Sequence, residues 1–365
     1  MNKKWMAAAM LVTTATASQA QSGNVAVYGL IDAGVEHVTN VGPAGDGLTR
    51  MPTLTGSIPS RIGFRGTEDL GNGLKAFFTL ENGLSLDTGV AGQGGRLFGR
   101  QALVGISGAW GAVTLGRQYN MYFYSLLDAD ILGPNLYGSA SVDSYIPNAR
   151  EDNAVGYRGT FGGLTVGATY SLGRDGVNAG PSPAGTNCAG ESASDKAACR
   201  AWSALLKYDR PNWGVATAYD RQNGGPAAFA GLTSSALRDT RTVLDGYVKL
   251  GALKLAGGVI RRDNEGAATP RTDLYFAGAT YGLTGAVTLD VQAFRLNVKQ
   301  SSNAATLLAV RATYKLSQRT AGYVTVGNIS NDGNLNISVS SGAPGSNPAA
   351  GSSQKGMMVG MRHAF

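Results

Sequence analysis

The amino-acid sequence predicts an all-β fold, an antiparallel transmembrane β-barrel of about sixteen strands. Three observations support this class. The N-terminus has the form of an export signal, runs of alternating apolar and polar residues recur along the rest of the chain, and the chain ends on a strand whose last residue is aromatic. Together they indicate a protein that crosses a membrane with strands, which must close into a barrel so that no backbone group lacks a partner.

Residues 1–20 have the composition of a secretory signal peptide. Two lysines supply the positive charge, Trp5 to Val12 form an apolar run, and Ser18-Gln-Ala20 places small residues at a cleavage site. The apolar run is shorter than the roughly 20 residues that a membrane-spanning helix needs, so a helical anchor is the less favoured alternative. We therefore expect the mature chain to start at Gln21 and to form one barrel domain over 21–365.

Composition agrees with this class. The chain of 365 residues holds 53 glycines and only 15% charged residues, and its mean hydropathy is −0.07. These values fit neither a helical membrane protein nor a disordered chain, and no linker divides the chain. The formal charge is +7, and removing residues 1–20, which hold two lysines and no acid, leaves +5. A basic balance suggests anionic partners, but nucleic acid is not expected for an exported protein.

Alternation identifies the strands in chain order. In 25–36 an apolar face opposes a face that carries both Asp32 and Glu36. Because successive side chains of a strand point to opposite sides, one face suits lipid and the other suits water. The same pattern recurs over 164–171, 287–294 and 307–316.

The last strand has the same two-faced character. Met357, Val359 and Met361 share one face, Arg362 lies on the other, and the chain stops at Phe365. An edge strand of a soluble core would show similar alternation, so this segment alone decides nothing. Aromatic residues near the strand ends are expected to contact outer-membrane lipid as interfacial girdles: Tyr170, Trp202, Tyr208, Trp213, Tyr281, Tyr314 and Phe365.

Short and long links alternate between the strands. About seven short and about eight long links give an even number of strands, about sixteen, and place both termini on the side of the short turns. A barrel of this size encloses a lumen too wide for side chains to fill, so we expect water inside it. The long links are expected at 39–60, 85–96, 120–150, 173–199, 221–238, 264–270, 298–303 and 331–354.

Cys188 and Cys199 are the only cysteines of the sequence. Export permits a disulfide between them, and closing this loop of 11 residues would contribute up to about 3 kcal/mol. A metal site is the alternative, but it lacks ligands because His37 and His363 are the only histidines. We favour the disulfide and expect neither a metal site nor a cofactor.

Four segments carry a more specific signal: YGLIDAG at 28–34, SRIGFRGTEDLGNGLKAFFTLENGL at 60–84, LFGRQALVGISGAWGAVTLGRQY at 97–119, and the terminal GMRHAF. In this order they resemble the Gram-negative general diffusion porins, in the branch typical of betaproteobacteria, over about Asn24 to Phe365. The resemblance implies a homotrimer of sixteen-stranded barrels in the cell outer membrane of a Gram-negative bacterium. It also implies that the third long loop of each barrel folds inward and narrows a pore.

By this resemblance the link 120–150 is the constriction loop, with Asp128 and Asp130 as its acids. An extracellular loop without a fixed position is the alternative. It is less favoured because apolar side chains in a long loop usually cover a surface. The apolar side chains concerned are Ile131, Leu132, Leu136 and Tyr137.

Arginines are expected to line the pore. Arg61 and Arg65 share the polar face of the segment 60–70, and an arginine facing lipid near the midplane would cost roughly 2–4 kcal/mol. The resemblance, rather than periodicity, places Arg100 and Arg150 in the pore. The alternative for each arginine is a salt bridge with an acid of the wall.

Charges of both signs are expected on the pore wall. Lys75 and Glu81 share the polar face of their strand, and Asp32 and Glu36 share that of theirs. The orientation of the Phe98–Ser107 strand is not predicted, because both of its faces are nearly apolar.

These features predict an outer-membrane pore for passive diffusion of small hydrophilic solutes and inorganic ions. Arginines that face loop acids across a poorly solvated gap favour a weak to moderate anion preference, although the loop acids could offset it. A substrate-specific channel is the main alternative, and a surface adhesin or structural barrel is a less favoured one. We do not expect an enzyme, because no grouping of Ser, His and acid stands out and the two histidines occupy strand positions.

Overall fold

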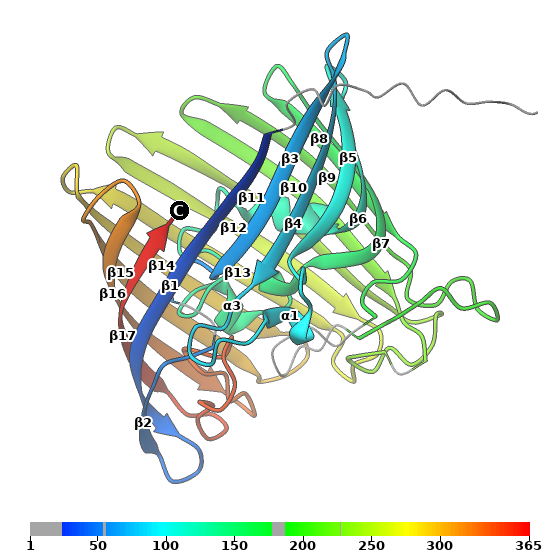
Figure 1. Cartoon of the computed structure of the whole chain (residues 1–365). Coiled ribbons are helices and arrows are strands. Elements are labelled where there is room, and N and C mark those ends of the chain that lie inside the picture. The colour runs from blue at the N-terminus through cyan, green and yellow to red at the C-terminus, as the bar shows by residue number, and fades with distance from the viewer. Residues whose placement is uncertain (1–23, 54–55, 177–186, 227) are drawn as a thin grey trace, which may run out of the picture.

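The computed structural model describes residues 24–53, 56–176, 187–226 and 228–365 (Figure 1). The predicted signal peptide at 1–20 lies outside these residues. Within the described part of the chain, the strands form a single sheet of 17, of which all but the short β2 make a closed ring of sixteen. This confirms the predicted antiparallel barrel.

The ring closes at β1 (Asn24–Val41), which pairs with β3 (Arg61–Gly71) along one edge and with β17 (Gln354–Ala364) along the other. Asp32 stands opposite Arg362 in the β1–β17 register. The first and last strands of the chain are therefore neighbours, and side chains far apart in sequence meet on one wall.

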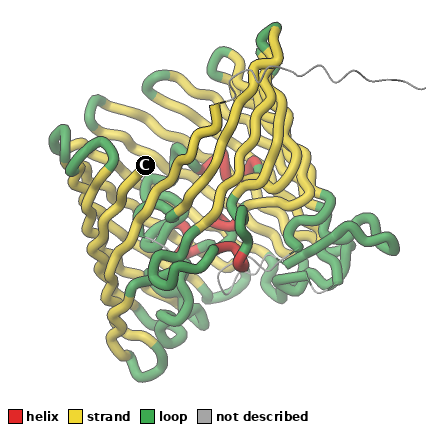
Figure 2. Tube along the Cα trace, in the orientation of Figure 1, coloured by secondary structure: helices red, strands yellow, loops and turns green. Residues whose placement is uncertain are grey.

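The remaining barrel strands follow in chain order, each antiparallel to the next: β4 (Leu74–Gly83), β5 (Gln101–Gly108), β6 (Gly111–Tyr119), β7 (Arg150–Phe161), β8 (Leu164–Ser171), β9 (Ala201–Arg210), β10 (Trp213–Asn223), β11 (Arg238–Leu250), β12 (Leu253–Asn264), β13 (Arg271–Gly282), β14 (Val287–Val298), β15 (Ala304–Lys315) and β16 (Thr320–Asp332). Short turns and long links alternate as predicted, and Figure 2 shows the short turns at the upper end and the long links at the lower end. One strand was not predicted. It is β2 (Asp46–Arg50), which lies in the first long link and pairs antiparallel with the C-terminal part of β1.

In the part of the chain that the structure describes, helical structure is confined to the long links. The short elements are α1 (Gly92–Gly95), α2 (Met121–Leu126), α3 (Ser139–Val142) and the 3-10 turn η1 (Ile146–Asn148). Among the described residues, no helix has both the length and the apolar character needed to cross a bilayer.

The apolar residues of the alternating segments face outward. In β1, Val25 and Val27 are 62% and 56% exposed, whereas Asp32 and Glu36 are buried inside the barrel. The predicted faces at 25–36, 164–171, 287–294 and 307–316 are confirmed, because in each segment the residues of the predicted apolar face are more exposed than those of the opposite face. Lipid outside and water inside explain this division, since each strand places alternate residues in the two media.

β5 takes the orientation that alternation alone could not assign. Val104 and Ile106 are exposed on the outer face, and Gly105 is buried between them. Arg100 precedes the first residue of β5, so its side chain is free of the strand alternation and lies on the inner side.

Residues 120–149 pack against the inner faces of strands on the far side of the ring. Asn120 Nδ2 donates to Asp220 Oδ1 of β10 at 2.8 Å, and the Leu132 amide donates to Gln292 Oε1 of β14 at 2.7 Å. Tyr137 of the same segment contacts a third strand, β1. Its hydroxyl donates to Glu36 Oε2 of β1 at 3.1 Å.

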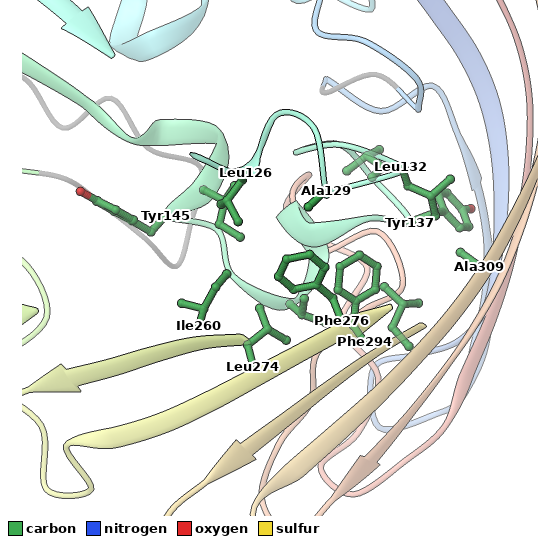
Figure 3. Close-up of a cluster of buried hydrophobic side chains, with 14 of the residues drawn as sticks. Leu126, Ala129, Leu132, Tyr137, Tyr145, Ile260, Leu274, Phe276, Phe294 and Ala309 are labelled. Carbon is green, nitrogen blue, oxygen red and sulfur yellow. The ribbon is translucent and has the colours of Figure 1, made fainter. Parts of the chain in front are cut away.

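An apolar cluster holds this segment in place (Figure 3). Leu126 and Leu132 of the segment are almost completely buried, as are the inward-facing wall residues around them. Burying a side chain of this size stabilises the fold by roughly 1.5–3 kcal/mol. The labelled wall residues of the cluster are Ile260, Leu274, Phe276, Phe294 and Ala309.

Candidate pore constriction

A cavity of about 480 Å³ lies between the segment 120–149 and the inner wall. Its wall side carries four arginines and one glutamate, which come from the first third and from the end of the chain. Its loop side is mainly apolar. The charged residues that line it are Arg61, Arg100, Arg311, Arg362, Glu81 and Asp130.

Glu81 of β4 joins two of these arginines. Arg100 Nε donates to Glu81 Oε1 at 2.6 Å, and Arg61 Nε lies 3.5 Å from Glu81 Oε2. Tyr28 also donates its hydroxyl to Glu81 Oε2, at 3.0 Å. One carboxylate therefore serves two guanidinium groups, which leaves this part of the wall with a surplus positive charge.

Arg311 of β15 and Arg362 of β17 extend the basic wall beyond the predicted residues. Arg311 Nη2 pairs with Asp290 Oδ2 at 3.1 Å. Arg362 Nη1 donates only to Ser57 Oγ, at 3.3 Å, and no described carboxylate lies within ion-pair distance of it. Arg362 is therefore the least neutralised cation of the cavity.

The sequence held a signal for both of these arginines, since each lies on the polar face of an alternating strand. The sequence did not predict where these two arginines lie around the barrel. Closure of β17 on β1 brings Arg362 to the same cavity as Arg61.

Two predicted arginines do not line the cavity. Arg65 lies further along β3, exposed, with its guanidinium carbon 5.1 Å from the centre of the Tyr28 ring. Arg150, at the start of β7, is buried and donates to the Tyr119 hydroxyl at 2.6 Å and to the Pro147 carbonyl at 2.9 Å.

The two predicted acids of the segment 120–149 differ in their position relative to the cavity. Asp130 lines the cavity but is largely buried, and Ser139 Oγ donates to its Oδ2 at 2.6 Å. This burial raises the pKa of the Asp130 carboxyl to about 6. Asp128 does not line the cavity and forms an ion pair with Lys207 of β9.

The wall acids of β1 are tied into networks. Asp32 Oδ1 accepts from the Tyr323 hydroxyl at 2.6 Å, and Glu36 Oε1 accepts from Arg50 Nε at the same distance. Lys75, by contrast, is exposed near the short-turn end of β4. The predicted wall residues therefore line the interior at different heights, and only Glu81 reaches the cavity.

The predicted disulfide is confirmed. Cys188 and Cys199 are bonded to each other, and the Cys199 amide donates to the Gly224 carbonyl at 2.9 Å. Both cysteines lie in the long link after β8, and this hydrogen bond joins that link to the one after β10. Among the described residues, no group of three or more His, Cys, Asp or Glu side chains is arranged to hold a metal ion.

A closed barrel with an apolar outer face, a charged inner wall and an internal cavity defines a membrane pore protein. The chain belongs to the Gram-negative porin family, whose profile matches residues 7–334. It is an outer-membrane porin of a Gram-negative bacterium, as its relatives are.

Two curated relatives are similar to the chain. Outer membrane porin protein 32 of Delftia acidovorans is 30% identical over 380 aligned positions, which cover 100% of both chains. An outer membrane porin protein of Bordetella pertussis is 38% identical over 191 positions, which cover 47% of this chain and 48% of the relative.

Solved structures agree. An anion-selective porin from Comamonas acidovorans superposes with a TM-score of 0.76 at 25% identity, covering 94% of this chain and 100% of that one. OmpT of Vibrio cholerae superposes with a TM-score of 0.66 at 13% identity, covering 95% and 99%, and shares the fold.

Proposed function

We propose that this porin is a passive diffusion pore for small hydrophilic solutes and inorganic ions, that it prefers anions, and that residues 120–149 narrow it. The observation that carries the proposal is the charge of the cavity, which is lined by four arginines and two acids. Arg362 lacks a carboxylate partner among the described residues, and the buried Asp130 has a raised pKa. In a narrow, poorly solvated gap, such an imbalance acts more strongly on ions than it does in bulk water.

The similarity to a solved porin that is named anion-selective supports the same preference. The anchoring of the segment 120–149 supports its role in narrowing the pore. Its contacts to β1, β10 and β14 lie on three well-separated parts of the ring, so the segment cannot swing clear without breaking buried hydrogen bonds.

Ion selectivity tests the proposal directly. Purified protein in planar bilayers under a KCl gradient should give a reversal potential of the sign expected for chloride preference. Arg362→Gln should lower the chloride-to-potassium permeability ratio about twofold, because it removes the least neutralised charge of the cavity. Arg65→Gln is the matched control, since it removes the same charge from the same inner surface away from the cavity.

A reversal potential of the cation-selective sign would refute the proposal. Equal losses in the Arg362 and Arg65 variants would show that the cavity does not set the preference. Currents that saturate with one solute would instead favour a substrate-specific channel.

We also propose a homotrimer embedded in outer-membrane lipid. The support is the fold shared with OmpT of Vibrio cholerae, which has been solved in a trimer form. Outward aromatic residues at strand ends, such as Tyr170 and Trp213, suit the lipid interface. Chemical crosslinking of the folded protein in outer-membrane vesicles should give a species of three chains.

A further inference from the structure

We propose that the cavity selects among anions and retains organic monoanions with a compact apolar body, of the benzoate type, better than small or fully polar anions. This inference rests on the proposed function, because it assumes that the cavity lies on the permeation path. It goes beyond that function by assigning a substrate class to the two unlike sides of the cavity.

The loop side of the cavity is apolar. Leu127 is 51% exposed although it belongs to a segment inside the barrel, so its exposed surface faces the lumen rather than lipid. The Phe123 ring stacks on the Tyr119 ring, with centroids 4.0 Å apart, and is thereby held at the edge of the cavity. The apolar loop residues that line the cavity include Phe123, Leu126, Leu127, Ile131, Leu132 and Pro134.

Loop carboxylates make up little of this surface, since Asp130 is the one loop acid that lines the cavity. Asp128 pairs with Lys207 on the wall of β9, and Asp130 is buried and accepts from Ser139. The result differs from the sequence expectation of arginines facing loop acids. The gap instead has a cationic side and an apolar side.

The cationic side can hold one carboxylate. Arg100 and Arg311 are each in close ion pairs, with Glu81 and Asp290. Among the described residues, Arg362 has only the Ser57 hydroxyl as a hydrogen-bond partner, and Arg61 lies 3.5 Å from a carboxylate that Arg100 already engages. An incoming carboxylate can therefore pair with Arg362, or with Arg61, without displacing a strong ion pair.

Both sides together define the ligand chemistry. A carboxylate at the arginines places the rest of a small molecule against Leu127 and Ile131, where an apolar body releases water from apolar surface. Chloride and sulfate have no apolar body, so they are held only by electrostatic attraction to the arginines. Sites of this kind, mostly apolar with a few charged groups, are typical of small-molecule binding.

The experiment measures chloride current through the folded protein in planar bilayers while benzoate, acetate or sulfate is added. The concentration that halves the current should be about tenfold lower for benzoate than for acetate. Benzamide, which has the same ring without the charge, should block less than benzoate. Equal block by benzoate and acetate, or by benzoate and benzamide, would overturn the inference.

The double variant Leu127→Ser with Ile131→Ser tests the apolar side. Both side chains are partly exposed, so the fold should tolerate the change. The benzoate-to-acetate ratio should fall to about one, because the apolar surface that favours benzoate is gone. Leu97→Ser is the matched control, because Leu97 is 70% exposed in another long link and does not line the cavity.

An unchanged benzoate-to-acetate ratio in the double variant would overturn the inference, as would an equal loss in the Leu97 variant. These failures differ from failure of the proposed function. Cation preference of the wild type in KCl would refute the anion pore itself, whereas chloride preference without benzoate preference would refute only the substrate class.

Discussion

Asp128 of the segment 120–149 forms an ion pair with Lys207 of β9, and Lys207 also lies 3.0 Å from Asp209. One wall lysine thus engages a loop acid and a wall acid together. The pair holds the Asp128 carboxylate at β9, away from the cavity that the arginines line. This ion pair therefore lowers the negative charge that the segment 120–149 presents to ions in the lumen.

Replacing this lysine should weaken the anion preference. In Lys207→Gln, Asp128 and Asp209 both lose their cation, and Asp128 can turn toward the lumen. We expect the chloride-to-potassium permeability ratio to fall about twofold, as determined from reversal potentials at low salt. Lys75→Gln removes the same charge from an exposed wall position and should change the ratio less. If the two variants behave alike, only the net charge of the wall matters.

Tyr323 of β16 is predicted to stabilise the wall near the first strand. Its hydroxyl donates to the buried carboxylate of Asp32 at 2.6 Å, so Tyr323→Phe leaves that carboxylate with one donor fewer. The free energy of unfolding should fall by about 1–3 kcal/mol, as observed in urea unfolding followed by tryptophan fluorescence. Tyr314→Phe is the control, since Tyr314 is 55% exposed on the outer face. A loss of similar size in the control would show that the bond to Asp32 is not the cause, because the exposed Tyr314 hydroxyl makes no such bond.

The disulfide is expected to protect the long link after β8. In Cys188→Ser with Cys199→Ser the link loses up to about 3 kcal/mol of local order, according to its separation of 11 residues. Trypsin should then cleave after Lys196 or Arg200 at least severalfold faster, as followed by mass spectrometry. Cleavage after Lys299, in a different link, serves as the internal reference and should not change. Equal rates at all three sites in wild type and variant would contradict the prediction.

The barrel could be predicted because membrane and water impose a strict period on each strand. Faces such as the one that carries Asp32 and Glu36 are visible in sequence for this reason, and the alternating links fix the even strand count. The orientation of β5 could not be predicted, because its inward-facing positions, including Gly105, carry no charge that would identify the side facing water. Arg100 lies just before β5, so the alternation of the strand does not predict the side to which its side chain points.

The candidate site could be predicted only in part. Arg61 and Glu81 followed from alternation, and they line the cavity. Arg311 and Arg362 did not, because their distance to the cavity depends on ring closure rather than on local sequence. The direction of the loop acids depends on remote partners such as Lys207, which no local pattern reveals.

Asp130 gives the pore a predicted pH dependence. Burial raises the pKa of its carboxyl to about 6, while Ser139 and the charge of Arg311 favour the ionised form and limit the shift. Below about pH 6 the carboxyl is mostly neutral, and as the pH rises through this value a negative charge appears beside the basic wall. The chloride-to-potassium permeability ratio should therefore decrease between about pH 5 and about pH 7. Asp130→Asn should hold the ratio at its low-pH value across this window, and an unchanged pH response in that variant would assign the titration to another group.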